Sequence, residues 1–258
     1  MFGDLRRVLV LAASLLPVWP LSAGAEVSVS VGLLPPHMDE AGEGRDADIL
    51  RAVMQDCMGE QLRLIVAPFT RHWTEYVDKK RDAVNTVPAS LALPGFRSVP
   101  YIVYQNGATV LASAKPVNTR SDLNGRSAVT FADGTEILGL KDLHFSRLVE
   151  QSDQEIHSNL LFAKRIDVIL ADGMIVAEYN RRLRERKAAA APIDASQPVR
   201  FTAVFPPVEY HLVFREEVMQ KRFDRCFAKQ TAEGRIEAIN HKYGDRYRDA
   251  LGRNYLGY

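Results

Sequence analysis

Asp172 lies where open α/β sheets hold their ligands, directly after a strand-like apolar run at 166–170. Gly173 and further apolar residues follow it, a pattern that also suits the start of a helix. An aspartate in this position either faces a ligand or caps that helix by accepting its free backbone N–H groups. Both alternatives stay open from the residues alone.

A glycine turn offers a second candidate site. Asp133, Gly134 and Thr135 follow the strand-like segment 127–131. The backbone N–H groups of such a turn can receive an anionic group at the start of a helix. An ordinary surface turn is the competing interpretation.

Aromatic residues gather after two of the expected strands. Phe69 and Trp73 follow the segment 62–66, and Tyr101 and Tyr104 come later in the chain. Such rings either sandwich the apolar part of a ligand or pack in the core, and we expect one or two of them to face a cleft. His37 follows Pro35 and Pro36 in a loop. It either touches a ligand or, as is usual for histidines in loops, meets solvent.

The sequence contains no motif of covalent catalysis or phosphate binding, since G-x-S-x-G, HExxH and a phosphate loop are all missing. The histidines and the two cysteines lack the spacing of a metal site. Lys and Arg number 33 against 32 Asp and Glu, a net charge of +1, which disfavours nucleic acid as a partner. We expect no cofactor and no metal.

Residues 1–25 have the pattern of a secretory signal peptide. Arg6 and Arg7 precede an apolar stretch that is too short for a membrane span, and small residues end at Ala25. We expect cleavage after Ala25 and export to the periplasm. In an oxidising compartment Cys57 and Cys226 can form a disulfide, with two buried free thiols as the alternative.

Strand-like and helical segments alternate along the rest of the chain, which predicts an α/β fold with mostly parallel sheets. Strands are expected in two successive units, with a crossing between the units near Lys115 and Pro116 and a return strand later in the chain. Two amphipathic helices close the chain. The expected strands cover 27–33, 62–66, 83–87, 108–112, 127–131, 166–170 and 209–214.

Five stretches, taken in order, resemble the family 3 extracellular solute-binding proteins, which are the periplasmic receptors of polar amino acid ABC transporters. They span nearly the whole chain after residue 25. The stretches are VSVGLLPP with GRDADILRAVM, APFTRHWTEYVDKKRDAV, GFRSVPYIVYQNGATVLAS, KRIDVILADG and AEGRIEAINHKYG.

The resemblance implies the type II, or Venus-flytrap, periplasmic-binding-protein fold, in which two α/β lobes are joined by two crossover hinge strands. Residues 26–113 and 208–258 would form the first lobe and residues 114–207 the second. The C-terminal helices would pack on the first lobe. Cys57 and Cys226 would then lie in the same lobe, which favours their disulfide.

The resemblance also assigns a ligand site between the lobes. Arg97 matches the arginine that binds the ligand carboxylate, and Asp172 matches the acid that takes its amino group, although Pro88 and a short spacer after Arg97 depart from the family pattern. The other expected contacts are Thr86, Ser90, Gly134, Thr135, Phe69, Trp73 and Tyr104.

The implied function is capture of a small polar or charged metabolite, an amino acid or related organic acid, without bond making. A monomeric receptor would close on this ligand and present it to an ABC permease in the inner membrane. Two alternatives stay open. One is an enzyme of the same fold, similar to cyclohexadienyl dehydratase, with Glu136 or Glu178 as its acid, and the other is a ligand sensor that is not coupled to transport.

Overall fold

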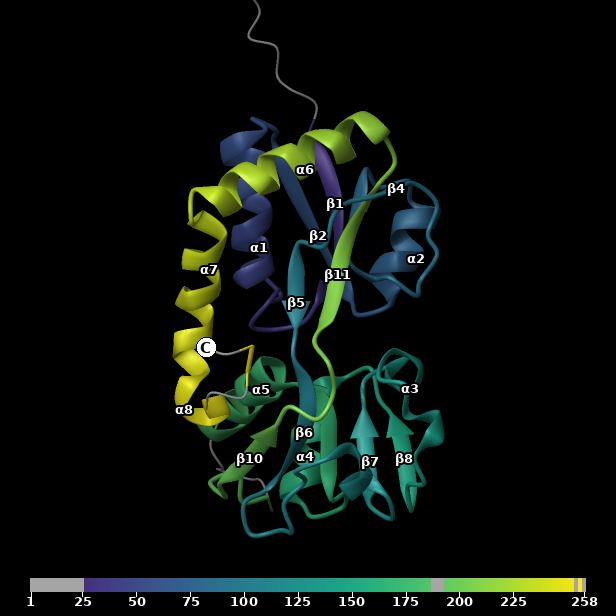
Figure 1. Ribbon diagram of the computed structural model, residues 1–258, viewed down its shortest axis with the longest axis vertical. Coiled ribbons are helices and arrows are strands. Elements are labelled where there is room, and N and C mark those ends of the chain that lie inside the picture. The colour runs from purple at the N-terminus through teal and green to yellow at the C-terminus, as the bar shows by residue number, and fades with distance from the viewer. Residues whose placement is uncertain (1–25, 187–192, 253–254, 257–258) are drawn as a thin grey trace, which may run out of the picture.

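Two sheets flanked by helices divide the computed structural model into two lobes (Figure 1). The structure describes residues 26–186, 193–252 and 255–256. The expected signal peptide and its cleavage site therefore lie outside the described residues.

The first sheet contains strands from both ends of the chain, in the order β2-β1-β3-β11-β4, with β5 also paired to β11. β1 pairs in parallel with β2 and β3, whereas β11 runs antiparallel to β3, β4 and β5. The strands are β1 (Val27–Leu33), β2 (Leu62–Pro68), β3 (Ala83–Pro88), β4 (Phe96–Arg97), β5 (Ile102–Tyr104) and β11 (Val208–Phe214).

The second sheet has the order β10-β6-β9-β7-β8. β7 is parallel to β8 and β9, and β6 is antiparallel to β9 and β10. The α/β class is confirmed, but both sheets are mixed because the chain crosses between the lobes in strands that run against their neighbours. The strands are β6 (Asn106–Leu111), β7 (Ser127–Thr130), β8 (Arg147–Glu150), β9 (Val168–Asp172) and β10 (Val199–Thr202).

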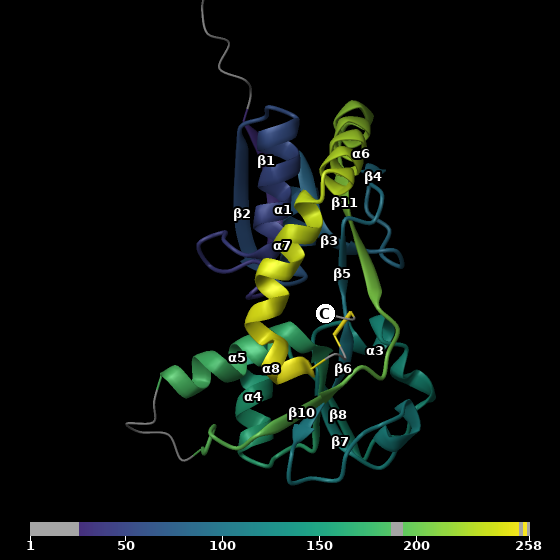
Figure 2. The ribbon, with the colours of Figure 1, turned by 60° about the vertical axis from the view of Figure 1, so that its left-hand side comes forward.

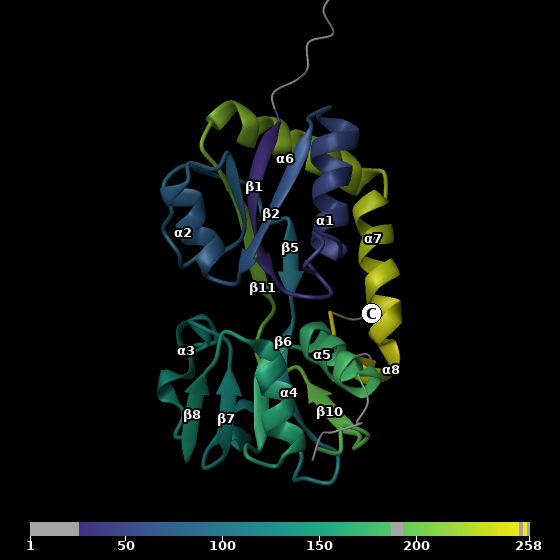
Figure 3. The ribbon, with the colours of Figure 1, turned by 180° about the vertical axis from the view of Figure 1, so that it is seen from behind.

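Helices cover the faces of both sheets (Figure 3). The first lobe carries α1 (Arg45–Leu50), η1 (Arg51–Cys57), α2 (Arg71–Asp78), α6 (Glu217–Ala232) and α7 (Arg235–Gly244). The second carries η2 (Arg120–Leu123), α3 (Gly134–Ile137), η3 (Leu140–Asp142), α4 (Gln154–Phe162) and α5 (Gly173–Glu185). Within the described ranges, no helix combines the length and apolar character needed to cross a membrane.

The chain crosses between the lobes at Gln105 and again at 203–207. β5 pairs in the first sheet and β6, which begins one residue after Gln105, pairs in the second. The crossing therefore precedes the expected position at Lys115 and Pro116. The strand 106–111 is buried throughout, so its sequence carries no sign of which sheet it joins. The side-chain amide of Gln105 donates to Phe205 O at 2.8 Å and so ties the two crossings together.

The last helical segments lie against the second lobe, whereas the sequence analysis placed them with the first. α7 leaves the first lobe and leads to η4 (Asp245–Tyr247) and α8 (Arg248–Leu251), beside α5 and β10 (Figure 2). Tyr247, Leu251 and Tyr255 form an apolar cluster with Met174 and Phe201 of the second lobe. Burial of these side chains draws the C-terminal segment across the junction.

A disulfide joins Cys57 at the end of η1 to Cys226 in α6. The two residues are 169 positions apart, and their Cα atoms lie 5.8 Å from each other. The predicted bridge is confirmed. It connects the beginning and the end of the first lobe.

Removal of this disulfide should lower the free energy of unfolding. The Cys57→Ala/Cys226→Ala variant is expected to lose about 2–5 kcal/mol, because a long loop of the unfolded chain is no longer closed. Urea unfolding measures the loss. Dithiothreitol should lower the urea midpoint of the wild-type protein to that of the variant and leave the midpoint of the variant unchanged. A wild-type midpoint that does not move on reduction contradicts this account.

Two buried histidines are held neutral, one in each lobe. Burial lowers the pKa of His72 to about 3 and that of His157 to about 4. Nε2 of His72 lies 3.2 Å from Asn85 O, and Nε2 of His157 lies 2.9 Å from Gln151 O. A carbonyl only accepts, so Nε2 donates in each case.

The protein should therefore lose stability as the pH falls below 6.5. The unfolded chain binds protons at the ordinary histidine pKa of about 6.5, whereas native His157 and His72 stay neutral down to about pH 4 and 3. The unfolded state binds more protons in this window, so the free energy of unfolding falls with pH.

Urea unfolding between pH 7 and 5 tests this expectation. His157→Gln keeps a donor for Gln151 O but does not titrate, so it should flatten the dependence on pH. His144→Gln at an exposed position is the matched control and should keep the wild-type slope. Equal slopes for wild type and His157→Gln contradict the assignment.

Candidate functional site

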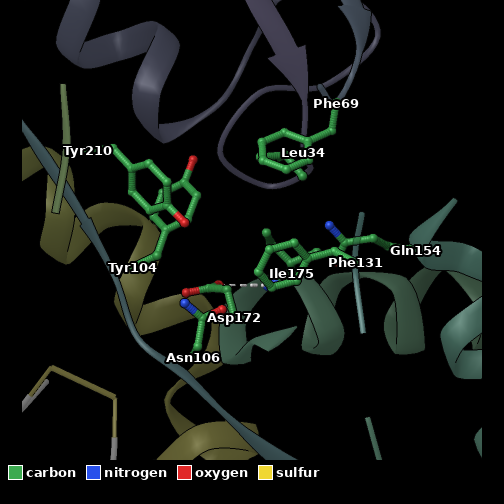
Figure 4. A pocket seen from close by; sticks show the side chains of 9 residues that line it. All are labelled: Leu34, Phe69, Tyr104, Asn106, Phe131, Gln154, Asp172, Ile175 and Tyr210. Carbon is green, nitrogen blue, oxygen red and sulfur yellow. Dashed lines mark hydrogen bonds between the residues drawn. The ribbon is translucent and has the colours of Figure 1, made fainter. Parts of the chain in front are cut away.

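A small cavity lies at the junction of the lobes and is lined from both of them (Figure 4). Its volume is about 10 Å³, which is room for about one water molecule. The first lobe contributes Leu34, Phe69, Tyr104 and Tyr210, and the second contributes Asn106, Phe131, Gln154, Asp172 and Ile175. The lobes are therefore closed on each other, and a larger guest requires them to part.

Asp172 is 2% exposed and ends β9 at the N-terminus of α5. Its Oδ1 accepts from the backbone N–H groups of Met174 and Ile175 at 2.9 and 3.1 Å. Its Oδ2 accepts from the backbone N–H of Gln105 at 3.0 Å and from the Tyr255 hydroxyl at 2.7 Å. Asp172 therefore caps α5, which is the role that the sequence analysis left open. The same carboxylate also accepts hydrogen bonds from Gln105 at the hinge and from Tyr255 in the C-terminal segment.

His37 supplies a fifth hydrogen bond to the same carboxylate from the first lobe. Its ring is fully buried, and Nε2 lies 3.2 Å from Oδ1 of Asp172. The carboxylate only accepts, so Nε2 carries the proton. Burial, followed by the charge of Arg45, lowers the pKa of His37 below its ordinary value. Neutral His37 is therefore the direct polar link from the first lobe to Asp172.

Arg45 and Asp46, in the first turn of α1, stand behind His37. The Arg45 guanidinium is 2% exposed and donates to Asp46 Oδ1 at 3.2 Å and to Val103 O at 3.3 Å. The Tyr104 hydroxyl donates to Asp46 Oδ2 at 2.6 Å, and its ring stacks on His37 with 4.3 Å between centroids. The N-cap of α1 is Gly44, and no side chain caps this helix.

Two further contacts hold the lobes together. Arg182 of α5 donates to Glu40 of the first lobe at 3.1 Å. The rings of Phe69 and Phe131 meet edge to face across the junction, with 6.2 Å between centroids. Parting the lobes therefore breaks an ion pair, an aromatic contact and the His37–Asp172 hydrogen bond.

Two side-chain amides in the lining each have one atom without a hydrogen-bond partner. The Nδ2 atom of Asn106 and the Oε1 atom of Gln154 are buried without a hydrogen bond. Both residues come from the second lobe and line the cavity. A buried amide without a partner is costly, so a polar group of a guest molecule has a donor and an acceptor available there.

The structure brings three of the sequence-predicted ligand contacts into the lining: Phe69, Tyr104 and Asp172. Trp73 is buried against Phe69, with 5.1 Å between ring centroids, and lies outside the lining. Its role is to support Phe69 from behind.

Thr86 lies within β3, whereas Ser90 and Arg97 lie around or after the turn that follows this strand. Thr86 is buried with a φ of 51°, an unusual conformation for a β-branched residue. Ser90 is exposed. The Arg97 guanidinium donates to the carbonyl oxygens of Pro88 at 3.1 Å and Leu91 at 2.6 Å. Arg97 therefore stabilises this turn, and it lies outside the lining of the cavity.

The turn at Gly134 and Thr135 already has an anionic partner. Glu150 accepts from the backbone N–H groups of Asp133 at 3.1 Å and of Thr135 at 2.8 Å. These hydrogen bonds lower the pKa of Glu150 although burial opposes them. The anion expected at this turn is thus a side chain of the protein itself.

Sequence reasoning missed six lining residues and the role of His37. Phe131 and Tyr210 lie at the end of or within expected strands, so their sequence positions did not distinguish them from core residues. Leu34 and Asn106 lie within stretches that carry the family resemblance, but no role was assigned to them, and Gln154 and Ile175 lie outside those stretches. The Pro35-Pro36 pair was the signal available for His37, because it ends β1 at the junction and turns the following loop inward.

Neither glutamate considered as a catalytic acid lines the cavity, and Glu178 does not have the raised pKa that this role needs. Glu178 is buried, yet hydrogen bonds from Arg181, Arg182 and Tyr247 outweigh burial and lower its pKa to about 2. Glu136 is exposed and pairs with Lys141. Among the residues that the structure describes, no group of three or more His, Cys, Asp or Glu is arranged to hold a metal ion.

No protein-family model and no curated protein matches the chain. Several solved structures do match the chain. The GluR0 ligand-binding core in complex with L-glutamate has a TM-score of 0.70 at 16% identity, over 86% of this chain and 99% of that one. A histidine kinase sensor domain with similarity to periplasmic binding proteins has a TM-score of 0.69 at 16% identity, over 85% and 96%.

The arginine-, lysine- and histidine-binding protein ArtJ from Geobacillus stearothermophilus has a TM-score of 0.67 at 18% identity. That match covers 84% of this chain and 94% of the other. These likenesses confirm the expected architecture: the chain has the two-lobed fold of the periplasmic binding proteins.

Proposed function

We propose that this protein captures a small polar or charged solute between its lobes and closes on it without chemical conversion. The observation that carries the proposal is the cavity at the lobe junction, which both lobes line and where Nδ2 of Asn106 and Oε1 of Gln154 lack a hydrogen bond. Hinged α/β lobes bind ligands in such a cleft because the closed form gains contacts that the open form lacks.

The fold supports this proposal. Similar solved structures include the glutamate complex of the GluR0 core and a binding protein for basic amino acids. The cleft-lining residues Phe69, Tyr104 and Asp172 belong to the proposed site. Phe69 packs against Phe131 of the other lobe, and Asp172 meets His37 across the junction.

The proposal includes export and delivery. The signal-like segment 1–25 would direct the chain to the periplasm, where the Cys57–Cys226 disulfide is stable. There a monomeric receptor would present its closed form to an ABC permease.

A filled cleft should abolish solute binding. Ile175 lines the cavity from α5 and is 3% exposed, so Ile175→Trp places a larger side chain where the solute must sit. A thermal shift screen with amino acids, amines and small organic acids identifies binding to the wild-type protein. A ligand at a hundred times its dissociation constant adds about 2.7 kcal/mol of stability, and Ile175→Trp should lose this gain.

Val218→Trp is the matched control, because Val218 is 63% exposed on α6. It should respond to the same solutes as the wild type. Circular dichroism of both variants checks that they are folded. Equal responses from Ile175→Trp and the wild type would place binding outside the cleft and overturn the proposal.

A further inference from the structure

The buried groups at the lobe junction carry more negative than positive charge. Asp172 and Asp46 are two carboxylates, Arg45 is the one guanidinium, and the exposed fractions of all three are at most 2%. His37 lies between the carboxylates, with Nδ1 3.9 Å from Asp46 and Nε2 3.2 Å from Asp172. With His37 neutral, this set holds one negative charge in excess. A buried charge without a counter-charge is costly, so the site favours a cation.

Asp172 has little capacity left for a ligand that donates hydrogen bonds. It already accepts five, three from backbone N–H groups and two from His37 and Tyr255. A carboxylate offers about four lone-pair directions. A primary ammonium would therefore compete with existing donors for these lone pairs, whereas a cation without N–H donors gains from the charge of Asp172 without competing for them.

Aromatic rings supply the other contacts that such a cation needs. Phe69 and Tyr210 from the first lobe and Phe131 from the second all line the cavity (Figure 4). The faces of aromatic rings attract methylated ammonium groups, which have no hydrogen bonds to lose.

The lining also lacks a partner for a carboxylate. None of the described residues around the cavity is lysine or arginine. The buried guanidinium of Arg45 donates to Asp46 and to Val103 O, and that of Arg97 donates to the turn after β3. An α-amino acid would thus bring an anionic group that finds no counter-charge.

We propose that the solute held between the lobes is a methylated ammonium compound without a carboxylate. This inference rests on the proposed binding function and names the class of its ligand. Nδ2 of Asn106 and Oε1 of Gln154, which lack a hydrogen bond, would receive a hydroxyl or a similar neutral polar group of the same molecule.

Isothermal titration of the wild-type protein with two probes tests whether the site favours a positive charge. One probe is choline, and the other is the neutral alcohol in which carbon replaces the choline nitrogen. The two probes have the same shape, so tighter binding of choline by at least tenfold reports the negative field and the ring contacts. L-Arginine and L-glutamate, titrated in parallel, should bind more weakly than choline. Affinity for the neutral alcohol equal to that for choline would overturn the inference.

Phe131→Leu tests the location, because it removes a ring face and keeps an apolar side chain. The affinity for choline should fall by a factor between about two and about thirty, which is the range expected for loss of a cation–π contact. The affinity for the neutral alcohol should change less. Phe96→Leu, at a residue 42% exposed on β4, is the control. Unchanged choline binding in Phe131→Leu would place the cation elsewhere and overturn the inference.

The outcomes separate this inference from the proposed function. If an amino acid or organic acid binds the wild type but not Ile175→Trp, and choline does not bind, the ligand class is wrong and the binding function stands. If no solute binds the wild-type protein, both fail.

Discussion

The burial of one carboxylate between two lobes is the constraint on which the architecture of this protein depends. A carboxylate removed from water needs donors for its lone pairs, and Asp172 obtains them from α5, the hinge strand, the first lobe and the C-terminal segment. Four parts of the chain therefore converge on one side chain. The position of Gln105 at the crossing and of Tyr255 near the chain end follows from the same requirement.

Much of the fold could be predicted because strands and helices alternate with regular boundaries, and because ordered motifs fix the sequence of units. The pairing of 106–111 with the second sheet could not, since a strand buried on both faces has no polar side to mark its partner. The departure of η4 and α8 from the first lobe was hidden for a related reason. Tyr247, Leu251 and Tyr255 are equally suited to any apolar surface, and nothing in their sequence indicates that they pack on Phe201 and Met174 of the second lobe.

The site was less predictable than the fold, as Arg97 and His37 illustrate. Arg97 has the residue type for binding a carboxylate, but the nearest acceptors after folding are carbonyl groups of its own turn. His37 was expected in a solvent-exposed loop, yet β1 ends at the junction and its loop passes between two aspartates. Residue type predicts which bonds a side chain can make, whereas the tertiary fold decides which partners are within reach.

The cost of opening the lobes decides whether a solute can control them. The hydrogen bonds that Gln105, Met174 and Ile175 donate to Asp172 lie on one side of the junction, so they survive a hinge motion. The bond from His37 breaks, at about 1.5–3 kcal/mol for a charged acceptor, and loss of the Phe69–Phe131 contact adds about 0.5–1.5 kcal/mol. The partly exposed Arg182–Glu40 pair adds about 1 kcal/mol or less. A ligand at a hundred times its dissociation constant contributes about 2.7 kcal/mol. These free energies are of similar size, so occupancy of the cleft can set the balance between open and closed forms.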